Sequence, residues 1–363
     1  MIKGKQVSRK MIAVNRRTHS FGNMKRIRTI LIGLGTVNIG LLKILQDKQA
    51  AIAEQLGLEF LIVAVADSTG VAVNPNGFSY SELIGFRAAK TKVKQLKEFK
   101  SVPVEEIAKH VASDLLIESS AGNLKTGNPG LEIVRGALRS GTSVVLANKA
   151  PLVFAFDELH NIADASHAHL AFSATVCGGL PVINVLQRDL KFATLKKFRG
   201  ILNATTNFIL HEIERGGTKQ EAIAEAQRLG AAEADPSHDV NGHDTANKLL
   251  IIMKTFTGYP GSISDIVVKG IEDVDRNDII QANANGNKIK LIALAERIKD
   301  SWVLSVKPMP VPRDSFLGTC DKWEMGIELE TDPYESICMK NFEADPVGTS
   351  AAVLRDAVDI FKD

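Results

Sequence analysis

Uninterrupted apolar runs alternate with amphipathic segments along the first part of the chain. The runs IRTILIGL, FLIVAVAD, DLLIESS and TSVVLANK lack polar–apolar alternation, which is typical of parallel strands buried on both faces. Between them, residues 37–57 and 131–141 place apolar side chains at helical spacing. Strand–helix–strand alternation predicts an α/β domain of the Rossmann type, with a doubly wound parallel sheet.

The pattern changes after about residue 152. We expect strands at 170–179 and 195–204, helices at 181–190, 219–230 and 245–258, and an antiparallel sheet between 266 and 338. The tail, residues 348–361, is an amphipathic helix that we expect to return to the first domain. The predicted plan is a dinucleotide-binding domain at 24–155 plus 343–363, and a second, α+β domain at 156–342.

Composition narrows the function without defining it. The chain has 363 residues, 45% of them hydrophobic, and a formal charge of +2, so neither nucleic acid nor a membrane is an expected partner. No apolar run approaches the ~20 residues of a membrane span. Cys177, Cys320 and Cys338 form no CxxC pair, so we expect neither zinc nor disulfides, and a cytoplasmic location. Residues 1–23 are rich in basic residues and are expected to be a disordered extension, a polybasic arm being the alternative.

The segment GLGTVNIG lies where a dinucleotide-binding loop should lie, between the first strand and the first helix. Gly33 permits the tight turn and Gly35 lets the backbone approach a pyrophosphate, with Thr36 and Val37 opening the helix. Asn38 stands where the third glycine of GxGxxG is usual, so the motif is incomplete.

Asp67 ends the second apolar run. A carboxylate at this place binds the ribose 2′-hydroxyl of NAD and repels the 2′-phosphate of NADP. The alternative is an ordinary turn aspartate. We expect NAD or NADP as cofactor, with NAD favoured.

The stretch EADPSHDVNGHDTANK, residues 233–248, allows three interpretations: a metal site, a solvated acidic loop or acid–base machinery. His238 and His243 are spaced i,i+5 rather than the i,i+4 of a zinc-binding helix, which disfavours metal. Asp244 and Lys248 are spaced i,i+4 and precede the apolar run LLIIM. Burial would lower the pKa of Lys248 toward that of a proton shuttle, and Asp244 would oppose that fall. Spacing alone does not decide between a loop and an acid–base site.

Five blocks together resemble homoserine dehydrogenases: GLGTVNIG, ESSAGNLKTGNPGLEIVRGALRSGTSVVLANKAPLV, SATVCGGLPVIN, RGILNATTNFIL and LGAAEADPSHDVNGHDTANKLLI. The resemblance covers most of the chain from about residue 24. It implies reversible oxidation of L-homoserine to L-aspartate 4-semialdehyde with NAD or NADP, on the route to threonine, methionine and isoleucine. It also implies that the second domain binds substrate and forms a homodimer.

The resemblance assigns roles to single residues. Lys248 matches the general acid/base, Asp244 the residue that orients it and binds substrate, and Lys149 a second lysine between cofactor and substrate. The remaining expected substrate-binding residues are Glu233, which takes the substrate ammonium, Asp239, Asn203 and Thr205. Ser120 is expected near the nicotinamide, and Gly348 is a further expected cofactor contact.

Several positions depart from the family pattern. Ser173 replaces a glutamate that binds a monovalent cation in some members, although the carbonyls of Val176, Gly178 and Leu180 could still bind Na⁺ or K⁺. DPVGTSAA replaces a Gly-Ala-Gly turn near Gly348. We expect no appended regulatory ACT or aspartokinase domain.

Two alternative functions remain at this point. Aspartate-semialdehyde dehydrogenase requires a thiolate nucleophile, for which Cys177 is the candidate, although a small buried residue is the expected interpretation. A non-catalytic dinucleotide-sensing protein would bind cofactor without turnover, and the basic segment 1–28 lacks a helix-turn-helix pattern.

Overall fold

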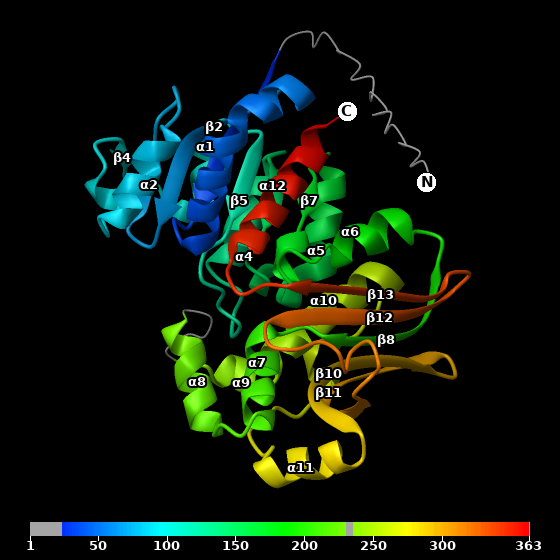
Figure 1. The fold of residues 1–363 in the computed structure, drawn as a ribbon. Coiled ribbons are helices and arrows are strands. Elements are labelled where there is room, and N and C mark those ends of the chain that lie inside the picture. The colour runs from blue at the N-terminus through cyan, green and yellow to red at the C-terminus, as the bar shows by residue number, and fades with distance from the viewer. Residues whose placement is uncertain (1–23, 230–234, 363) are drawn as a thin grey trace, which may run out of the picture.

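The computed structural model describes residues 24–229 and 235–362, and Figure 1 shows them as two sheets with their helices. The predicted extension at residues 1–23 and the predicted substrate ligand Glu233 lie outside the described residues.

The first sheet has seven strands in the order β4-β3-β2-β1-β5-β6-β7. β2, β1, β5, β6 and β7 run parallel, whereas β3 and β4 continue the sheet as antiparallel strands beyond β2. The Rossmann-type parallel sheet is thus confirmed. The strand bounds are β1 Lys25–Ile32, β2 Leu58–Asp67, β3 Gly70–Val73, β4 Phe99–Lys100, β5 Leu115–Glu118, β6 Ser143–Leu146 and β7 Leu170–Ala171.

Helices cover both faces of this sheet (Figure 1). Leu31 and Ile117 pack toward α1 and the C-terminal helix α12, whereas Ile30 and Leu116 face the core beneath α4 and α5. This two-sided burial explains the apolar runs in the sequence. The helices of this layer are α1 Thr36–Leu56, α2 Tyr80–Ala88, α3 Ile107–His110, α4 Gly130–Arg139, α5 Ala150–Ala165 and α12 Val347–Phe361.

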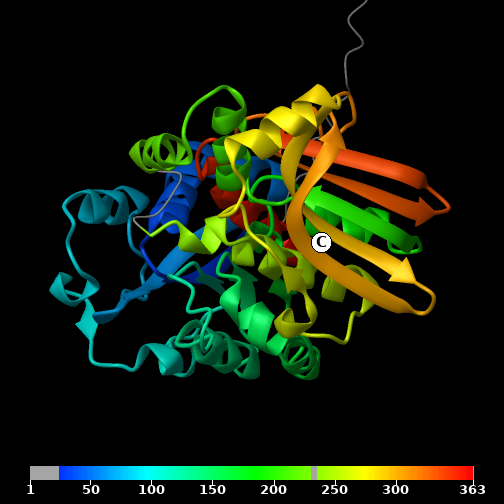
Figure 2. The ribbon, with the colours of Figure 1, turned by 90° about the horizontal axis from the view of Figure 1, so that it is seen from below.

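The second sheet has six strands in the order β13-β12-β8-β10-β11-β9. Its pairings are antiparallel except for β9 with β11, and Figure 2 shows green β8 between orange β12 and yellow β10. This confirms a second domain of sheet and helices. The strand bounds are β8 Thr194–Ile201, β9 Val267–Val268, β10 Asn287–Ile298, β11 Ser301–Pro312, β12 Glu324–Asp332 and β13 Glu335–Phe342.

Helices α7 and α10 pack on the inner face of the second sheet, where Leu250 and Ile251 join the same apolar core as Ala293 and Leu304. That core continues without a break to the α4–α5 face of the first sheet. The remaining helix bounds are α6 Val182–Asn184, α7 Ala204–Glu214, α8 Lys219–Arg228, α9 Ser237–Val240, α10 His243–Thr257 and α11 Arg276–Ala284.

Three local expectations differ from the structure. The first sheet extends past the expected boundary at residue 155, because α5 spans it and β7 pairs with β6 in one more strand–helix–strand unit. The strand expected at 170–179 ends after Ala171, since the backbone turns at Ser173–Thr175 and takes positive φ at Cys177 and Gly178. Within the expected sheet, residues 276–284 form α11, whose capping box of Asp275 and Asp278 starts a helix.

The C-terminal helix docks tightly against the first helix. A Cβ added to Gly40 would collide with Ser350 Oγ and lie 3.0 Å from Ser350 Cβ. Ser350 is fully buried, and its hydroxyl donates to the carbonyl of Val37 at 2.9 Å, so it has little freedom to move aside. This contact seats α12 beside α1, and it supports the expectation that the tail returns to the first domain.

We predict that Gly40→Ala lowers the free energy of unfolding by about 1–3 kcal/mol, because the helices must separate or Ser350 must give up its hydrogen bond. Urea denaturation measures the change. Gly85→Ala is the matched control: its Cβ meets nothing within 4 Å, and it should stabilise α2 by about 0.5–1 kcal/mol. Equal effects of the two substitutions would contradict the packing argument.

Candidate functional site

A cavity of about 610 Å³ opens at the carboxyl ends of β1 and β5, where the strand order of the parallel sheet reverses. In open α/β sheets this switch point is where nucleotides bind. The expected cofactor residues Gly33, Gly35, Asp67 and Ser120 all line this cavity. These residues, which the sequence analysis expects to bind the cofactor, therefore share one cavity, although Gly33 and Ser120 lie 87 positions apart (120 − 33) in the chain.

Gly33 and Gly35 have different structural roles in the expected dinucleotide-binding loop. Gly33 has φ +79°, and a Cβ there would lie 2.9 Å from Ser120 Cα, so only glycine lets the two loops meet. A Cβ on Gly35 would meet nothing within 4 Å, so protein packing does not require this glycine. Its open surface at the N-terminus of α1 suits the close approach of a pyrophosphate.

Asn38 replaces the usual third glycine without disturbing this turn. Its side chain is fully buried, and Nδ2 donates to the carbonyls of Ile32 at 3.1 Å and Gly33 at 2.7 Å. Asn38 therefore ties the start of α1 to the end of β1, and the turn keeps its shape without a third glycine at this position. The close approach of α1 and α12 is made at Gly40.

A second cavity of about 370 Å³ adjoins the N-termini of α1 and α12. Thr36, Lys43 and Arg87 line it together with Pro346 at the entry to α12. Two helix N-termini and two cationic side chains make this an electropositive pocket suited to phosphate groups. Val37, also an expected cofactor residue, does not line this cavity; its carbonyl accepts from Ser350 of α12.

Three charged side chains meet at the centre of the molecule. Lys149 Nζ lies 3.0 Å from Asp244 Oδ1, and Lys248 Nζ lies 2.8 Å from Asp244 Oδ2. Lys149 precedes α5 beside the first sheet, whereas Asp244 and Lys248 lie on α10 beneath the second. The left-handed Gly242 starts α10 so that its first turn presents both side chains, one helical turn apart. The pairing of Asp244 and Lys248 expected from their spacing is present, and Lys149 joins it.

Asn203 organises the carboxylates of this cluster. Its Nδ2 donates to Asp239 Oδ1 and to Asp244 Oδ2, both at 2.8 Å, while its Oδ1 caps α7 by accepting from the Thr206 amide. Thr205 is buried in the first turn of the same helix. The expected substrate residues Asp239 and Asn203 thus lie around Asp244, the partner of Lys248, and Thr205 follows two positions after Asn203.

Charge and burial set the protonation of the cluster. Burial would raise the pKa of Asp244, but the ammonium groups of Lys149 and Lys248 hold it well below its usual range. Burial would likewise lower the pKa of Lys248, but Asp244 overcomes this and raises it above the ordinary lysine value. Burial, helped by the charge of Asp244, raises the pKa of Asp239 to about 6. Of the two opposing effects expected from the sequence, the charge of Asp244 outweighs burial, which favours the ammonium form of Lys248.

The carbonyl of Leu202 contacts this cluster, which the sequence did not indicate. It accepts from Lys248 Nζ at 2.8 Å and from the Cys177 thiol at 3.9 Å. Cys177 is 1% exposed, and burial raises the pKa of its thiol to about 12, so it is a protonated, enclosed group rather than a nucleophile. A main-chain acceptor leaves no residue-type signal in a sequence.

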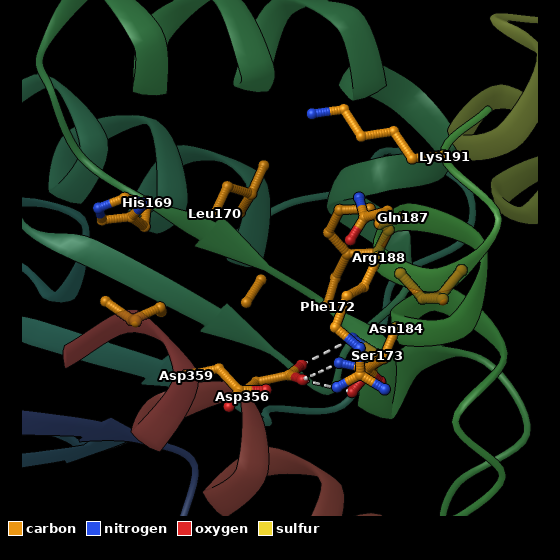
Figure 3. Close-up of a pocket in the computed structure, with 13 residues that line it drawn as sticks. His169, Leu170, Phe172, Ser173, Asn184, Gln187, Arg188, Lys191, Asp356 and Asp359 are labelled. Atoms are coloured by element: carbon orange, nitrogen blue, oxygen red, sulfur yellow. Dashed lines mark hydrogen bonds between the residues drawn. The ribbon is translucent and has the colours of Figure 1, made fainter. Parts of the chain in front are cut away.

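The turn at residues 176–180 is held by carboxylates from the C-terminal region. Ser173, which replaces the cation-binding glutamate, donates its amide and hydroxyl to buried Asp356 at 2.7 and 2.6 Å (Figure 3). Glu343 Oε2 accepts from the Gly179 amide at 2.8 Å, and Oε1 accepts from Thr349 at 3.1 Å. Gly348, an expected cofactor contact, packs against Gly179 at this same junction. Sequence reasoning missed Asp356 and Glu343.

Comparison with known proteins matches both halves of the chain to one family. Residues 33–173 match the model "Homoserine dehydrogenase, NAD binding domain", and residues 181–358 match the model "Homoserine dehydrogenase". A Methanocaldococcus jannaschii homoserine dehydrogenase is 33% identical over 92% of this chain and 98% of its own length. This chain covers most of that relative.

Solved structures agree. The crystal structure of a homoserine dehydrogenase from Thiobacillus denitrificans matches 94% of this chain and 74% of its own with a TM-score of 0.81 at 29% identity. A hyperthermophilic archaeal homoserine dehydrogenase in complex with NADPH matches 93% of this chain and 98% of its own with a TM-score of 0.79 at 26% identity.

We predict that Asp244→Asn lowers the free energy of unfolding at neutral pH by about 3–5 kcal/mol, because the partly buried ammonium groups of Lys149 and Lys248 lose their counter-charge. The contribution of Asp244 is present above the unfolded carboxylate pKa and fades as the pH falls below it, since its folded pKa is depressed. Chemical denaturation at two pH values measures it. Asp157→Asn is the control, because Asp157 is 76% exposed and pairs with Lys254 at the surface. That substitution should cost at most about 1 kcal/mol; a similar loss in both variants would disprove the buried network.

Proposed function

We propose that this chain, which belongs to the homoserine dehydrogenase family, interconverts L-homoserine and L-aspartate 4-semialdehyde with Lys248 as the proton donor and acceptor. The observation that supports this assignment best is the bridge of buried Asp244 between Lys248, on α10, and Lys149, which follows β6 of the first sheet. The family's place in threonine, methionine and isoleucine biosynthesis then applies to this chain.

The nicotinamide coenzyme supplies the hydride in the reduction and accepts it in the oxidation. Negative charge develops on the substrate oxygen during reduction, and the Lys248 ammonium both stabilises that charge and transfers its proton there. The neutral amine left behind takes the proton back in the reverse reaction. Lys149 remains charged beside Asp244 and adds a second cation, while Asp244 holds both ammonium groups in place.

Carboxylates near Lys248 suit a zwitterionic substrate. Asp239 lies beside Asp244 and is oriented by Asn203, so its ionised form can accept hydrogen bonds from an ammonium group. We assign the substrate ammonium to Asp239 together with Glu233, which lies outside the described residues. Asn203 and Thr205 then contact the rest of the amino-acid moiety.

Aspartate-semialdehyde dehydrogenase fits the site less well. Thioester chemistry needs an accessible thiolate, whereas the Cys177 thiol is enclosed and its pKa is raised to about 12. A sensor without chemistry would not need two lysines bridged by a buried aspartate, a pairing that costs desolvation energy.

We propose NAD as the preferred coenzyme. Asp67 Oδ1 accepts from the Thr69 amide at 2.7 Å and Oδ2 from the Val93 amide at 3.1 Å, which holds the carboxylate at the cavity wall. A 2′-phosphate here would meet that negative charge, whereas a 2′-hydroxyl can donate to it. Arg87 and Lys92 line the same cavity and would favour a phosphate, so Asp67 is the deciding residue in this proposal.

A monovalent cation at the turn formed by residues 176–180 is a further proposal. The carbonyls of Val176, Gly178 and Leu180 would bind Na⁺ or K⁺, and Glu343 brings a carboxylate to this turn in place of the one missing at Ser173. Two existing bonds compete with the cation: Glu343 binds the Gly179 amide, and the Leu180 carbonyl accepts from Val182.

A homodimer formed through the outer face of the second sheet is also proposed. The strand register aligns a row of outward-facing side chains across six strands: Val267, Ser305, Leu294, Arg199, Glu328 and Cys338. Val267 is 66% exposed and Val303, two residues from Ser305, is 48% exposed, so apolar area lies open at one end of this row. A dimer would cover it.

Two observations bear on the location of the protein. Among the described residues, no helix has the length and apolar character that crossing a membrane requires. The three cysteines are free thiols, and we propose the reducing cytoplasm as their compartment.

We predict that Lys248→Ala lowers kcat for homoserine oxidation at least about 100-fold while the Kd of the coenzyme changes little, because the proton acceptor is lost and the cavity is not. Wild-type oxidation should speed up as the pH rises, since the pKa of Lys248 is raised and the neutral amine is scarce at neutral pH. Steady-state kinetics measure kcat and its pH dependence, and coenzyme titration measures the Kd.

Cys177→Ala is the control and should retain turnover. Loss of activity in Cys177→Ala, with activity kept in Lys248→Ala, would favour the thiol mechanism.

We predict that NADH forms from homoserine more efficiently than NADPH, and that Asp67→Asn shifts the ratio of kcat/KM values toward NADP by about tenfold or more, equivalent to 1.4 kcal/mol. The shift follows from loss of a negative charge in a cavity that keeps Arg87 and Lys92. Parallel assays with the two coenzymes measure it. A wild-type preference for NADP that Asp67→Asn leaves unchanged would refute the role of Asp67.

A further inference from the structure

A carboxylate lies buried at the edge of the coenzyme cavity. Glu118 is the last residue of β5, beside the end of β1, and it is fully buried. Carboxylates are rarely buried without a positive partner, because desolvation disfavours the charged form. Neither the reaction proposed above nor the family resemblance gives this residue a role.

Glu118 fixes the direction in which the hydroxyl of Ser120 donates its proton. Its Oε1 accepts from the Ser120 amide at 3.0 Å and from the Ser120 hydroxyl. Because that hydroxyl donates its one proton to Glu118, Ser120 Oγ can offer the cavity only its lone pairs. Ser120 lines the cavity and presses against Gly33, so the loop that carries it has little freedom to turn.

Glu118 also contacts the segment that leads to Lys149. Its main-chain carbonyl accepts from the Ala147 amide at 2.9 Å and from the Asn148 amide at 3.4 Å. Asn148 in turn accepts from the Ala150 amide at 3.0 Å and so holds the start of α5. Glu118 therefore contacts both the loop that carries Ser120, through its side chain, and the segment that leads to Lys149, through its main chain.

The charge of Glu118 is not paired. Burial raises its pKa to about 7, while hydrogen bonds from Ser120 oppose that rise; no charged side chain of residues 24–229 and 235–362 contributes. Charged residues on adjoining elements are engaged elsewhere or face the solvent-filled cavity: Lys149 pairs with Asp244, Glu132 pairs with Arg135, and Glu105 lines the cavity wall.

We propose that Glu118 is a positioning residue for the coenzyme, which holds Ser120 as an acceptor beside the nicotinamide and favours the oxidised ring over the reduced one. The oxidised nicotinamide carries a positive charge and the reduced ring is neutral. A nearby unpaired carboxylate therefore stabilises the oxidised form selectively, and low dielectric around the buried group strengthens the effect. This inference rests on the coenzyme site of the proposed function, but not on the identity of the substrate.

The test compares the Kd values of NAD⁺ and NADH for the full chain without substrate, by calorimetry, from about pH 5.5 to about pH 8.5. In the wild type, the ratio of Kd for NADH to Kd for NAD⁺ should increase as Glu118 ionises, because a folded pKa near 7 places the titration in this window. In Glu118→Gln the ratio should fall about tenfold at the alkaline end, equivalent to 1.4 kcal/mol, and lose its pH dependence.

Two further variants separate charge from position. Ser120→Ala keeps the charge and removes the acceptor, so both Kd values should rise while their ratio keeps its pH dependence. Asp356→Asn is the control, because burial also raises the pKa of Asp356 but it lies among Ser173 and Asn184, away from the coenzyme cavity (Figure 3). Its ratio should match the wild type.

An unchanged ratio and pH profile in Glu118→Gln would overturn the proposal, as would an equal change in Asp356→Asn. If Glu118→Gln does not fold, Ser120→Ala provides the test. This variant keeps the Glu118 carboxylate, so a ratio of Kd values that does not change with pH would contradict the proposal that Glu118 titrates beside the nicotinamide ring. Because no substrate is present, failure of homoserine turnover would leave these coenzyme measurements intact and would count only against the proposed reaction.

Discussion

A carboxylate enclosed with two ammonium groups is the constraint on which the rest of this molecule depends. Asp244 sits between Lys149, at the end of the first sheet, and Lys248, on the helix beneath the second. Two positive charges at 3.0 and 2.8 Å keep Asp244 ionised, and Asp244 keeps Lys248 protonated despite burial. The same contacts therefore join the two sheets, fix the geometry of the cluster and set the protonation state that the proposed chemistry requires.

The sequence predicted those features that depend on neighbouring positions. The turn at Gly33 and the i,i+4 pair of Asp244 and Lys248 were predicted because a helix or a tight turn relates residues a few positions apart. The sign of the Lys248 pKa shift was not predictable, because it depends on the charges that surround the amine in space. Lys149 lies 95 positions before Asp244, as 244 − 149 shows, and no local pattern links them, so only the family resemblance indicated Lys149. Asp356 is equally remote from Ser173, which it contacts, and the resemblance assigned neither Asp356 nor Glu118 a role, so both were missed.

Departures from the family pattern are balanced by contacts elsewhere in the chain. Asn38 fills the place of a glycine and bonds the carbonyls that end β1, while Gly40 permits the approach of α12. Ser173 lacks a carboxylate, and Asp356 and Glu343 bring theirs to the adjoining turn from the far end of the sequence. The C-terminal helix thus supports the coenzyme loop on one side and the 176–180 turn on the other.

The protonation state of Lys248 is the most direct test of this account. Selective isotope labelling of lysine, with Lys248→Arg to assign the signal, would follow the titration of its side chain by NMR in the protein without ligands. We predict a pKa above the ordinary lysine value, which falls when Asp244 is replaced by asparagine. A pKa near neutrality in the intact protein would contradict the central claim, because Lys248 would then be a neutral amine held by burial rather than an ammonium held by Asp244.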